Sequence, residues 1–179
     1  MKHLYVCWLF AVAAVTVIPA VAQSREEPSR KLTHTREAFR FSVAASYAKV
    51  FPLFGAYEER KWATGFDPQF LYPVPANDQQ GMVFTTIQDG LSRVWTNTAF
   101  DAASGHVQYV YSIADVMVAF IDIHITNAGA HETSIEVVYE RTALHPEANE
   151  RVTQMAQVDS NSGPHWAEMI NGYLKSAAK

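Results

Sequence analysis

The feature that most constrains the fold is a series of short segments in which apolar and polar residues alternate. Alternation with a period of two is typical of strands that bury one face. Turn residues such as Asp89-Gly90 and Ser104-Gly105 divide one segment from the next. The sequence therefore predicts an antiparallel sheet of seven strands, at 39–43, 67–73, 81–88, 92–101, 106–114, 116–127 and 131–143.

Two helical patterns complete the plan. Between the first two strands, apolar residues recur at helical spacing over 47–54, where Pro52 and Gly55 limit the helix to a turn or two. The chain closes with an apolar stripe of helical spacing at 164–176, formed by Trp166, Met169, Ile170, Tyr173 and Leu174. The predicted fold class is α+β: a curved seven-stranded antiparallel sheet gripping a long C-terminal helix, with two short helices between strands 1 and 2. Such a plan commonly leaves a cavity between sheet and helix.

The amino terminus has the pattern of a secretory signal peptide. Lys2 and His3 precede an apolar stretch at 4–18, and Pro19 and small residues separate that stretch from Gln23. The stretch is about 15 residues long, shorter than the roughly 20 that span a bilayer. We therefore predict cleavage after residue 22 and a periplasmic or secreted protein, with a retained membrane anchor as the alternative.

The remaining chain is expected to form one domain. Residues 23–37 are polar without apolar periodicity and predict a flexible leader, so that the domain covers 38–179. Cys7 is the only cysteine, so the mature chain has no thiol, and its length suffices for a core without disulfides. Without residues 1–22 the chain keeps 13 basic and 18 acidic residues. Nucleic acid and anionic membrane surfaces are therefore not expected partners, and the oligomeric state stays open.

Loop length in the hairpin of 116–127 and 131–143 decides which side chains share a face. A three-residue loop at 128–130 sets Ile121 opposite Val137 on one face and puts Asp122 and His124 on the other. A two-residue loop mixes apolar and charged partners on both faces, which burial disfavours. We therefore favour the three-residue loop.

Asp122, His124 and Tyr109 are the candidate catalytic residues. A histidine oriented by a carboxylate moves protons at neutral pH. A two-residue turn after 113 brings Tyr109 and Tyr111 to the His124 side and builds a polar cavity, whereas a three-residue turn leaves both tyrosines with the isoleucines. We favour the interpretation that Asp122 and His124 lie on a solvated convex face, with the polar cavity as the alternative.

Aromatic residues are the candidate ligand contacts. Large rings at strand or helix spacing are often plain core. Several rings with hydroxyl or N–H groups that face one interior nevertheless suit an apolar pocket with a few oriented polar groups. The predicted ligand-binding residues are Phe41, Trp62, Trp95, Tyr109, Tyr111, Tyr139, Trp166, Met169 and Tyr173.

The order of several motifs resembles a branch of the START/SRPBCC superfamily, the helix-grip proteins related to polyketide cyclases and the birch-pollen allergen. The resemblance covers residues 38–176 and rests on 51–54, Glu59, Trp62, Gly65, Phe66, Pro68, 70–73, 81–86 and 139–144. It implies binding of sterols, phospholipids, polyketides or plant hormones between the sheet and the C-terminal helix, with cyclisation or dehydration in some members. His145 stands where serine is often found, and the export signal is not typical of the superfamily. No catalytic residue is carried over.

These observations favour the binding or transport of a hydrophobic small molecule or lipid in the cavity. The alternatives are a cofactor-independent cyclase, dehydratase or isomerase that uses the same cavity, and an interaction domain whose pocket is filled by its own aromatic side chains. The sequence contains no glycine-rich phosphate loop, nucleophile elbow or metal-type spacing of His and Cys, so no cofactor and no metal are expected. The other histidines of the mature chain are expected singly on the surface: His34, His106, His131, His145 and His165.

Overall fold

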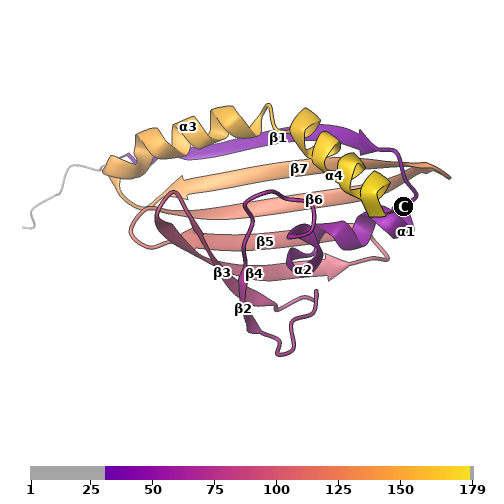
Figure 1. Cartoon of the computed structure of the whole chain (residues 1–179). Coiled ribbons are helices and arrows are strands. Elements are labelled where there is room, and N and C mark those ends of the chain that lie inside the picture. Colours follow the sequence, from indigo (N-terminus) through magenta and orange to yellow (C-terminus); the bar gives the residue numbers. More distant parts are fainter. Residues whose placement is uncertain (1–30, 178–179) are drawn as a thin grey trace, which may run out of the picture.

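The computed structural model describes residues 31–177, and the predicted signal peptide and the first part of the predicted leader lie outside the described residues. Seven antiparallel strands form one sheet in the order β1-β7-β6-β5-β4-β3-β2 (Figure 1). All seven predicted strands are confirmed, as β1 His34–Val43, β2 Gln69–Tyr72, β3 Val83–Gln88, β4 Leu91–Asp101, β5 His106–Ile113, β6 Met117–Gly129 and β7 Glu132–Ala143.

The first strand begins earlier than its apolar alternation indicates. His34 pairs with Thr142, and the pairing with β7 continues without interruption to Val43. Residues 34–37 therefore belong to the folded sheet and not to a flexible leader. Their side chains are polar because β1 is an edge strand, and its backbone hydrogen bonds with β7 need no apolar side chain.

The β6–β7 hairpin keeps the predicted faces but not the predicted register. Ile121 lies opposite Tyr139, two residues from the expected Val137. The loop between the strands is two residues long, and a bulge between Asn127 and Gly129 adds one residue to β6. The extra residue of the bulge shifts the pairing of β6 with β7 by one position. The isoleucines of β6 therefore still point to the core face, which a two-residue loop without a bulge would not allow.

Three short helical segments connect β1 and β2. The α-helices α1 (Tyr47–Val50) and α2 (Ala56–Glu59) are joined by the 3-10 turn η1 (Phe51–Phe54). This arrangement confirms the two predicted short helices. The buried residues of η1 belong to the core cluster of the sheet, which fixes the position of α2 over the concave face.

The carboxyl-terminal part contains two helices where the sequence predicts one. The predicted helix is α4 (Gly163–Ala177), and a second helix, α3 (Asn149–Asp159), follows β7 after the 3-10 turn η2 (Pro146–Ala148). Figure 1 shows α3 and α4 one after the other along the β1 and β7 side of the sheet. The prediction missed α3 because only Val152 and Ala156 of its apolar residues are buried, while its Val158 is exposed.

The core fills the space between the concave face of the sheet and these helices. On β5 and β6 the residues that point into it alternate strictly with outward residues, as expected for a sheet with one buried face. On α4, Ile170 is fully buried and Trp166 packs edge-on against Phe39 of β1. Within residues 31–177, no helix has the length and apolar character needed to cross a membrane.

Candidate functional site

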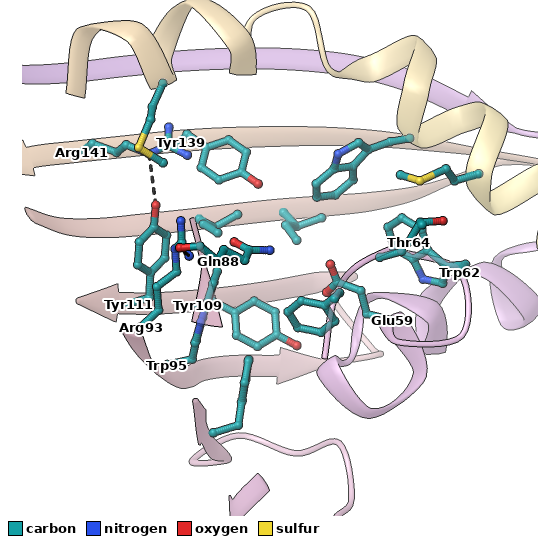
Figure 2. Close-up of a pocket in the computed structure, with 18 residues that line it drawn as sticks. Glu59, Trp62, Thr64, Gln88, Arg93, Trp95, Tyr109, Tyr111, Tyr139 and Arg141 are labelled. Atoms are coloured by element: carbon teal, nitrogen blue, oxygen red, sulfur yellow. Dashed lines mark hydrogen bonds between the residues drawn. The ribbon is translucent and has the colours of Figure 1, made fainter. Parts of the chain in front are cut away.

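A cavity of about 230 Å³ lies between the concave face of the sheet and the helices. Its lining comes from every strand from β3 to β7, from the segment around α2 and from both carboxyl-terminal helices (Figure 2). The lining residues are Glu59, Trp62, Ala63, Thr64, Phe66, Phe84, Gln88, Arg93, Trp95, Tyr109, Tyr111, Ile121, Ile123, Tyr139, Arg141, Met155, Trp166 and Met169. Of these, Thr64 and Gln88 are exposed and mark where the cavity meets solvent.

A larger hollow of about 630 Å³ runs beside α3. Its lining is mostly charged or amide side chains on the surface, including Asp89, Glu147, Glu150 and Gln154. Ligand pockets are predominantly apolar with a few oriented polar groups, which describes the cavity under the helices and not this surface hollow.

Most of the predicted ligand-binding residues line the cavity. They are Trp62, Trp95, Tyr109, Tyr111, Tyr139, Trp166 and Met169. Phe41 and Tyr173 do not line it. Phe41 packs beside Phe39 and Trp166 at the β1 edge, and Tyr173 is a partly buried residue against the core.

The two tryptophans of the aromatic walls are held in place by hydrogen bonds of their indole N–H groups. Trp62 Nε1 donates to the Leu53 carbonyl at 2.7 Å, and Trp95 Nε1 donates to Thr86 Oγ1 at 2.9 Å. The Trp95 ring lies 4.3 Å from the Tyr111 ring, centroid to centroid. Because both indole N–H groups are already satisfied, these tryptophans offer apolar contact without an unpaired donor.

One end of the cavity is cationic. In Figure 2, Arg93, Tyr111 and Arg141 group together, away from Glu59. Arg141 Nε donates to the Tyr111 hydroxyl at 3.3 Å, and both arginine side chains are only 4% exposed. Two buried guanidinium groups beside one hydroxyl make a strong donor set for an anionic group.

The two arginines differ in their partners. Arg141 forms a buried ion pair with Asp159 at the end of α3, with Arg141 Nη2 3.2 Å from Asp159 Oδ1. Arg93 donates to the Gln88 carbonyl at 3.1 Å, and its nearest carboxylate is 3.9 Å away on Asp89, a side chain that is 76% exposed. Burial lowers the pKa of the Arg93 guanidinium. Within residues 31–177, the only carboxylate that pairs with the buried Arg93 cation is therefore the distant, exposed one of Asp89.

Glu59, the last residue of α2, presents its carboxyl group to the cavity (Figure 2). Within residues 31–177 this carboxyl group has no side-chain hydrogen bond or salt bridge. Burial, and secondly the nearby carboxylate of Asp78, raise its pKa from 4.5 to about 8. Glu59 is therefore mostly protonated at neutral pH and does not neutralise Arg93.

Asp78 fixes the helix that carries Glu59. Its two carboxylate oxygens accept the backbone N–H groups of Tyr57 at 2.7 Å and Glu58 at 3.2 Å, which caps the start of α2. A Cβ atom on Gly55 would lie 2.2 Å from the Asp78 side chain, so only glycine allows this approach. The cap therefore sets the direction from which Glu59 enters the cavity.

Two further tyrosine hydroxyls lie at the cavity, those of Tyr109 and Tyr139. Tyr109 donates to the Phe54 carbonyl at 2.9 Å, while the hydroxyl of Tyr139 has no hydrogen-bond partner in the described chain. Burial raises the pKa of both phenols, so both stay protonated donors. Tyr139 is thus free to donate to a bound molecule.

The three candidate catalytic residues are not brought together. The turn between β5 and β6 has three residues, so Tyr109 pairs with Ile121 on the concave face. Asp122 and His124 point to the opposite, convex face, where the His124 side chain is 52% exposed. The structure therefore agrees with the favoured interpretation of a solvated convex face, and the alternative polar cavity of Tyr109, Asp122 and His124 is not formed.

Sequence reasoning missed the charged groups of the cavity. The predicted site residues do not include Arg93 or Arg141, and no catalytic role is predicted for Glu59. Side chains two residues apart on a strand point to the same face of the sheet. Both arginines could therefore be placed in the cavity, because Arg93 lies two residues before Trp95 and Arg141 two residues after Tyr139.

No protein-family model matches the sequence, and no curated protein matches it. Solved structures do match. Norcoclaurine synthase from Thalictrum flavum, in complex with dopamine and hydroxybenzaldehyde, is 12% identical with a TM-score of 0.60 over 82% of this chain and 88% of that chain. A Streptomyces aromatase/cyclase is 14% identical with a TM-score of 0.59 over 82% of this chain and 97% of that chain.

Ara h 8.0201 is 17% identical, with a TM-score of 0.54 over 80% of this chain and 99% of that chain. At these identities the similarity concerns the fold. The sheet, the short helices after its first strand and the long C-terminal helix together form a helix-grip fold, which the chain shares with these solved structures.

Proposed function

We propose that this protein binds a small hydrophobic molecule, one or two rings in size, that carries an anionic group. The observation that carries the proposal is an aromatic cavity with a buried, under-neutralised guanidinium group, Arg93, at one end. Buried charges in proteins are paired, and a ligand carboxylate or phenolate would complete the pairing here. The neighbouring structures include a complex with two single-ring aromatic molecules, which supports the aromatic part of this ligand class.

The volume of the cavity narrows the ligand class. At about 230 Å³ it lies below the roughly 300–1,000 Å³ of sites that hold drug-sized ligands. A two-chain lipid or a sterol is too large for this space. The apolar part of a small aromatic acid would contact Trp95 and Trp166, while its acid group would reach Arg93 and Tyr111.

A matched ligand pair tests the proposal. We expect 1-naphthoate to bind to the purified protein at least tenfold more tightly than 1-naphthalenemethanol, which has the same rings and no charge. A tenfold ratio corresponds to about 1.4 kcal/mol, within the range of a charge-assisted hydrogen bond. Isothermal titration calorimetry measures both affinities. Equal affinities for acid and alcohol, or binding of neither, would contradict the proposal.

Two variants, each with a control variant, locate the interaction. Arg93→Met keeps an apolar stem of similar length and is expected to remove the preference for the acid, whereas Arg36→Met, an exposed residue of β1, is expected to keep it. Thr64→Trp, at the exposed rim, is expected to weaken binding of both ligands by obstructing the entrance. Asp67→Trp is its control, because Asp67 is exposed and outside the lining.

A second candidate function, cofactor-independent proton transfer on a bound carbonyl compound, is favoured by Glu59. A carboxyl group with a pKa of about 8 in a water-poor cavity has the acidity expected of a general acid–base. Its carboxylate form would take a proton from carbon next to the carbonyl group. The free Tyr139 hydroxyl would donate to the enolate oxygen that forms.

Exchange of carbon-bound protons tests this step without knowledge of the substrate. We expect the protein to accelerate the exchange of the α-protons of 2-tetralone in D₂O, with a rate that rises through about pH 8 as Glu59 ionises. The measurement is proton NMR. Glu59→Gln should abolish the acceleration and retain naphthoate binding, while Glu58→Gln, on the same helix and paired with Lys61, should change neither. Exchange that persists in Glu59→Gln would exclude this residue as the base.

A further inference from the structure

A cluster of metal-ligating side chains lies on the convex face of the sheet, opposite the cavity. His106 of β5 and His124 of β6 are paired directly across the two strands, and their rings are stacked with centroids 5.0 Å apart and planes 7° apart. Asp122 lies on the same face of β6. Its Oδ1 is 2.6 Å from His106 Nε2, and its Oδ2 is 3.2 Å from His124 Nε2.

We propose that His106, Asp122 and His124 form a binding site for a divalent transition-metal ion such as Zn²⁺ or Cu²⁺. One donor atom from each residue lies within 4.8 Å of the other two. Zinc binds imidazole nitrogen at about 2.0–2.1 Å and carboxylate oxygen at about 2.0–2.2 Å, so donors around a tetrahedral ion are about 3.3 Å apart. The two histidine–carboxylate separations, 2.6 and 3.2 Å, are near this value, and a bound ion would replace these two hydrogen bonds.

The surroundings hold the donors in place. Gln108, paired with Asp122 across the strands, donates to Asp122 Oδ1 at 3.2 Å, which orients the carboxylate as outer hydrogen bonds do in metal sites. Gly105 precedes His106 with a φ of +74°, and a Cβ there would lie 2.0 Å from the Ile125 carbonyl oxygen. This close approach locks the register that puts His106 beside His124.

The charge and the donor atoms of the cluster favour a transition-metal ion over Mg²⁺ or Ca²⁺. Two neutral imidazoles and one carboxylate give a net charge of −1 and a borderline-soft donor set, which suits Zn²⁺ and Cu²⁺ better than Mg²⁺ or Ca²⁺. The next residue across the sheet, Glu136, is held by Arg40 at 2.6 Å and does not compete for the histidines. The three side chains are between 32% and 52% exposed, so an ion can reach them and keep water at an open position.

Calorimetric titration with Zn²⁺ at pH 7.5, on protein without a polyhistidine tag, tests the site. We expect one equivalent to bind with micromolar affinity. His106→Ala and His124→Ala should each weaken this binding at least tenfold, and Asp122→Asn should weaken it as well by removing the anionic donor. His131→Ala, an exposed histidine in the β6–β7 turn, is the matched control and should leave the affinity unchanged.

Electron paramagnetic resonance of bound Cu²⁺ reports which nitrogen atoms coordinate the ion, independently of any change in protein stability. We expect hyperfine coupling to two imidazole nitrogens in the parent protein and to one in His106→Ala. Naphthoate affinity should be the same with and without the metal, because the two sites lie on opposite faces. No Zn²⁺ binding, undiminished binding by the double His106→Ala/His124→Ala variant, or binding of Mg²⁺ as tight as that of Zn²⁺ would overturn the proposal.

Discussion

At the scale of single residues, the cavity contains two ionisable groups, Arg93 and Glu59, that are not paired with each other. Arg93 stays charged, because a guanidinium group does not lose its proton in a protein. Glu59 responds to the same burial by keeping its proton, which its pKa of about 8 reflects. The result is an apolar space with a net positive charge at neutral pH, which is why an anionic ligand fits it.

The raised pKa of Glu59 makes protein stability depend on pH. The group binds a proton on folding at pH values between 4.5, the ordinary value, and about 8, so the free energy of unfolding falls as pH rises through this window. We expect a contribution of up to about 1.4 kcal/mol per pH unit, which Glu59→Gln removes. The variant should therefore gain stability over the parent protein between pH 5 and 8.

Urea unfolding at pH 5, 7 and 9 measures this effect. Glu58→Gln should follow the parent protein, because Glu58 is paired with Lys61 near the surface. A stability difference between the parent protein and Glu59→Gln that stays constant across the three pH values would show that Glu59 is ionised in the folded state throughout.

At the scale of secondary structure, α3 depends on one buried ion pair. Asp159 at its end pairs with Arg141 of β7, and both side chains are nearly inaccessible to solvent. Asp159→Ala leaves the Arg141 charge buried without its carboxylate, which costs about 3–5 kcal/mol. Urea unfolding measures the loss. Glu150→Ala, an exposed acid on the same helix, should change stability by less than about 0.5 kcal/mol, and an equal effect of the two variants would contradict this role of the pair.

Elements with regular side-chain periodicity could be predicted from the sequence, and those that depend on tertiary contacts could not. The seven strands and α4 repeat their apolar residues at a strand or helix period. In α3, the buried Asp159 takes a position that an apolar residue would occupy, so the pattern does not stand out. The β6–β7 register depends on the bulge at 127–129, which has no signal in the alternation of either strand.

Some residues of the candidate site could likewise be predicted from the sequence, and others could not. Aromatic residues that line the cavity could be found, because large rings on the core face of predicted strands mark its walls. Arg93 lies two residues before Trp95 and so could be placed on the same face, whereas Glu59 could not be assigned, since its environment depends on tertiary contacts. The His106–His124 pair follows from the register of β5 and β6, which spacing along the chain does not reveal.

At the scale of the whole molecule, the sheet separates two chemically different faces. Its concave face and the helices enclose the aromatic cavity, while its convex face carries the cluster of His106, Asp122 and His124. The central strands β5 and β6 supply residues to both, with alternate side chains on opposite sides. Ligand binding in the cavity therefore needs no rearrangement of the convex face.

A crystal structure of the protein with 1-naphthoate would show whether Arg93 binds the acid group of a ligand in the cavity. We expect the naphthalene rings in the cavity against Trp95, with the carboxylate within about 2.7–3.2 Å of the Arg93 guanidinium group. Naphthoate bound in the surface hollow beside α3, or bound in the cavity with its carboxylate turned towards Glu59, would contradict it.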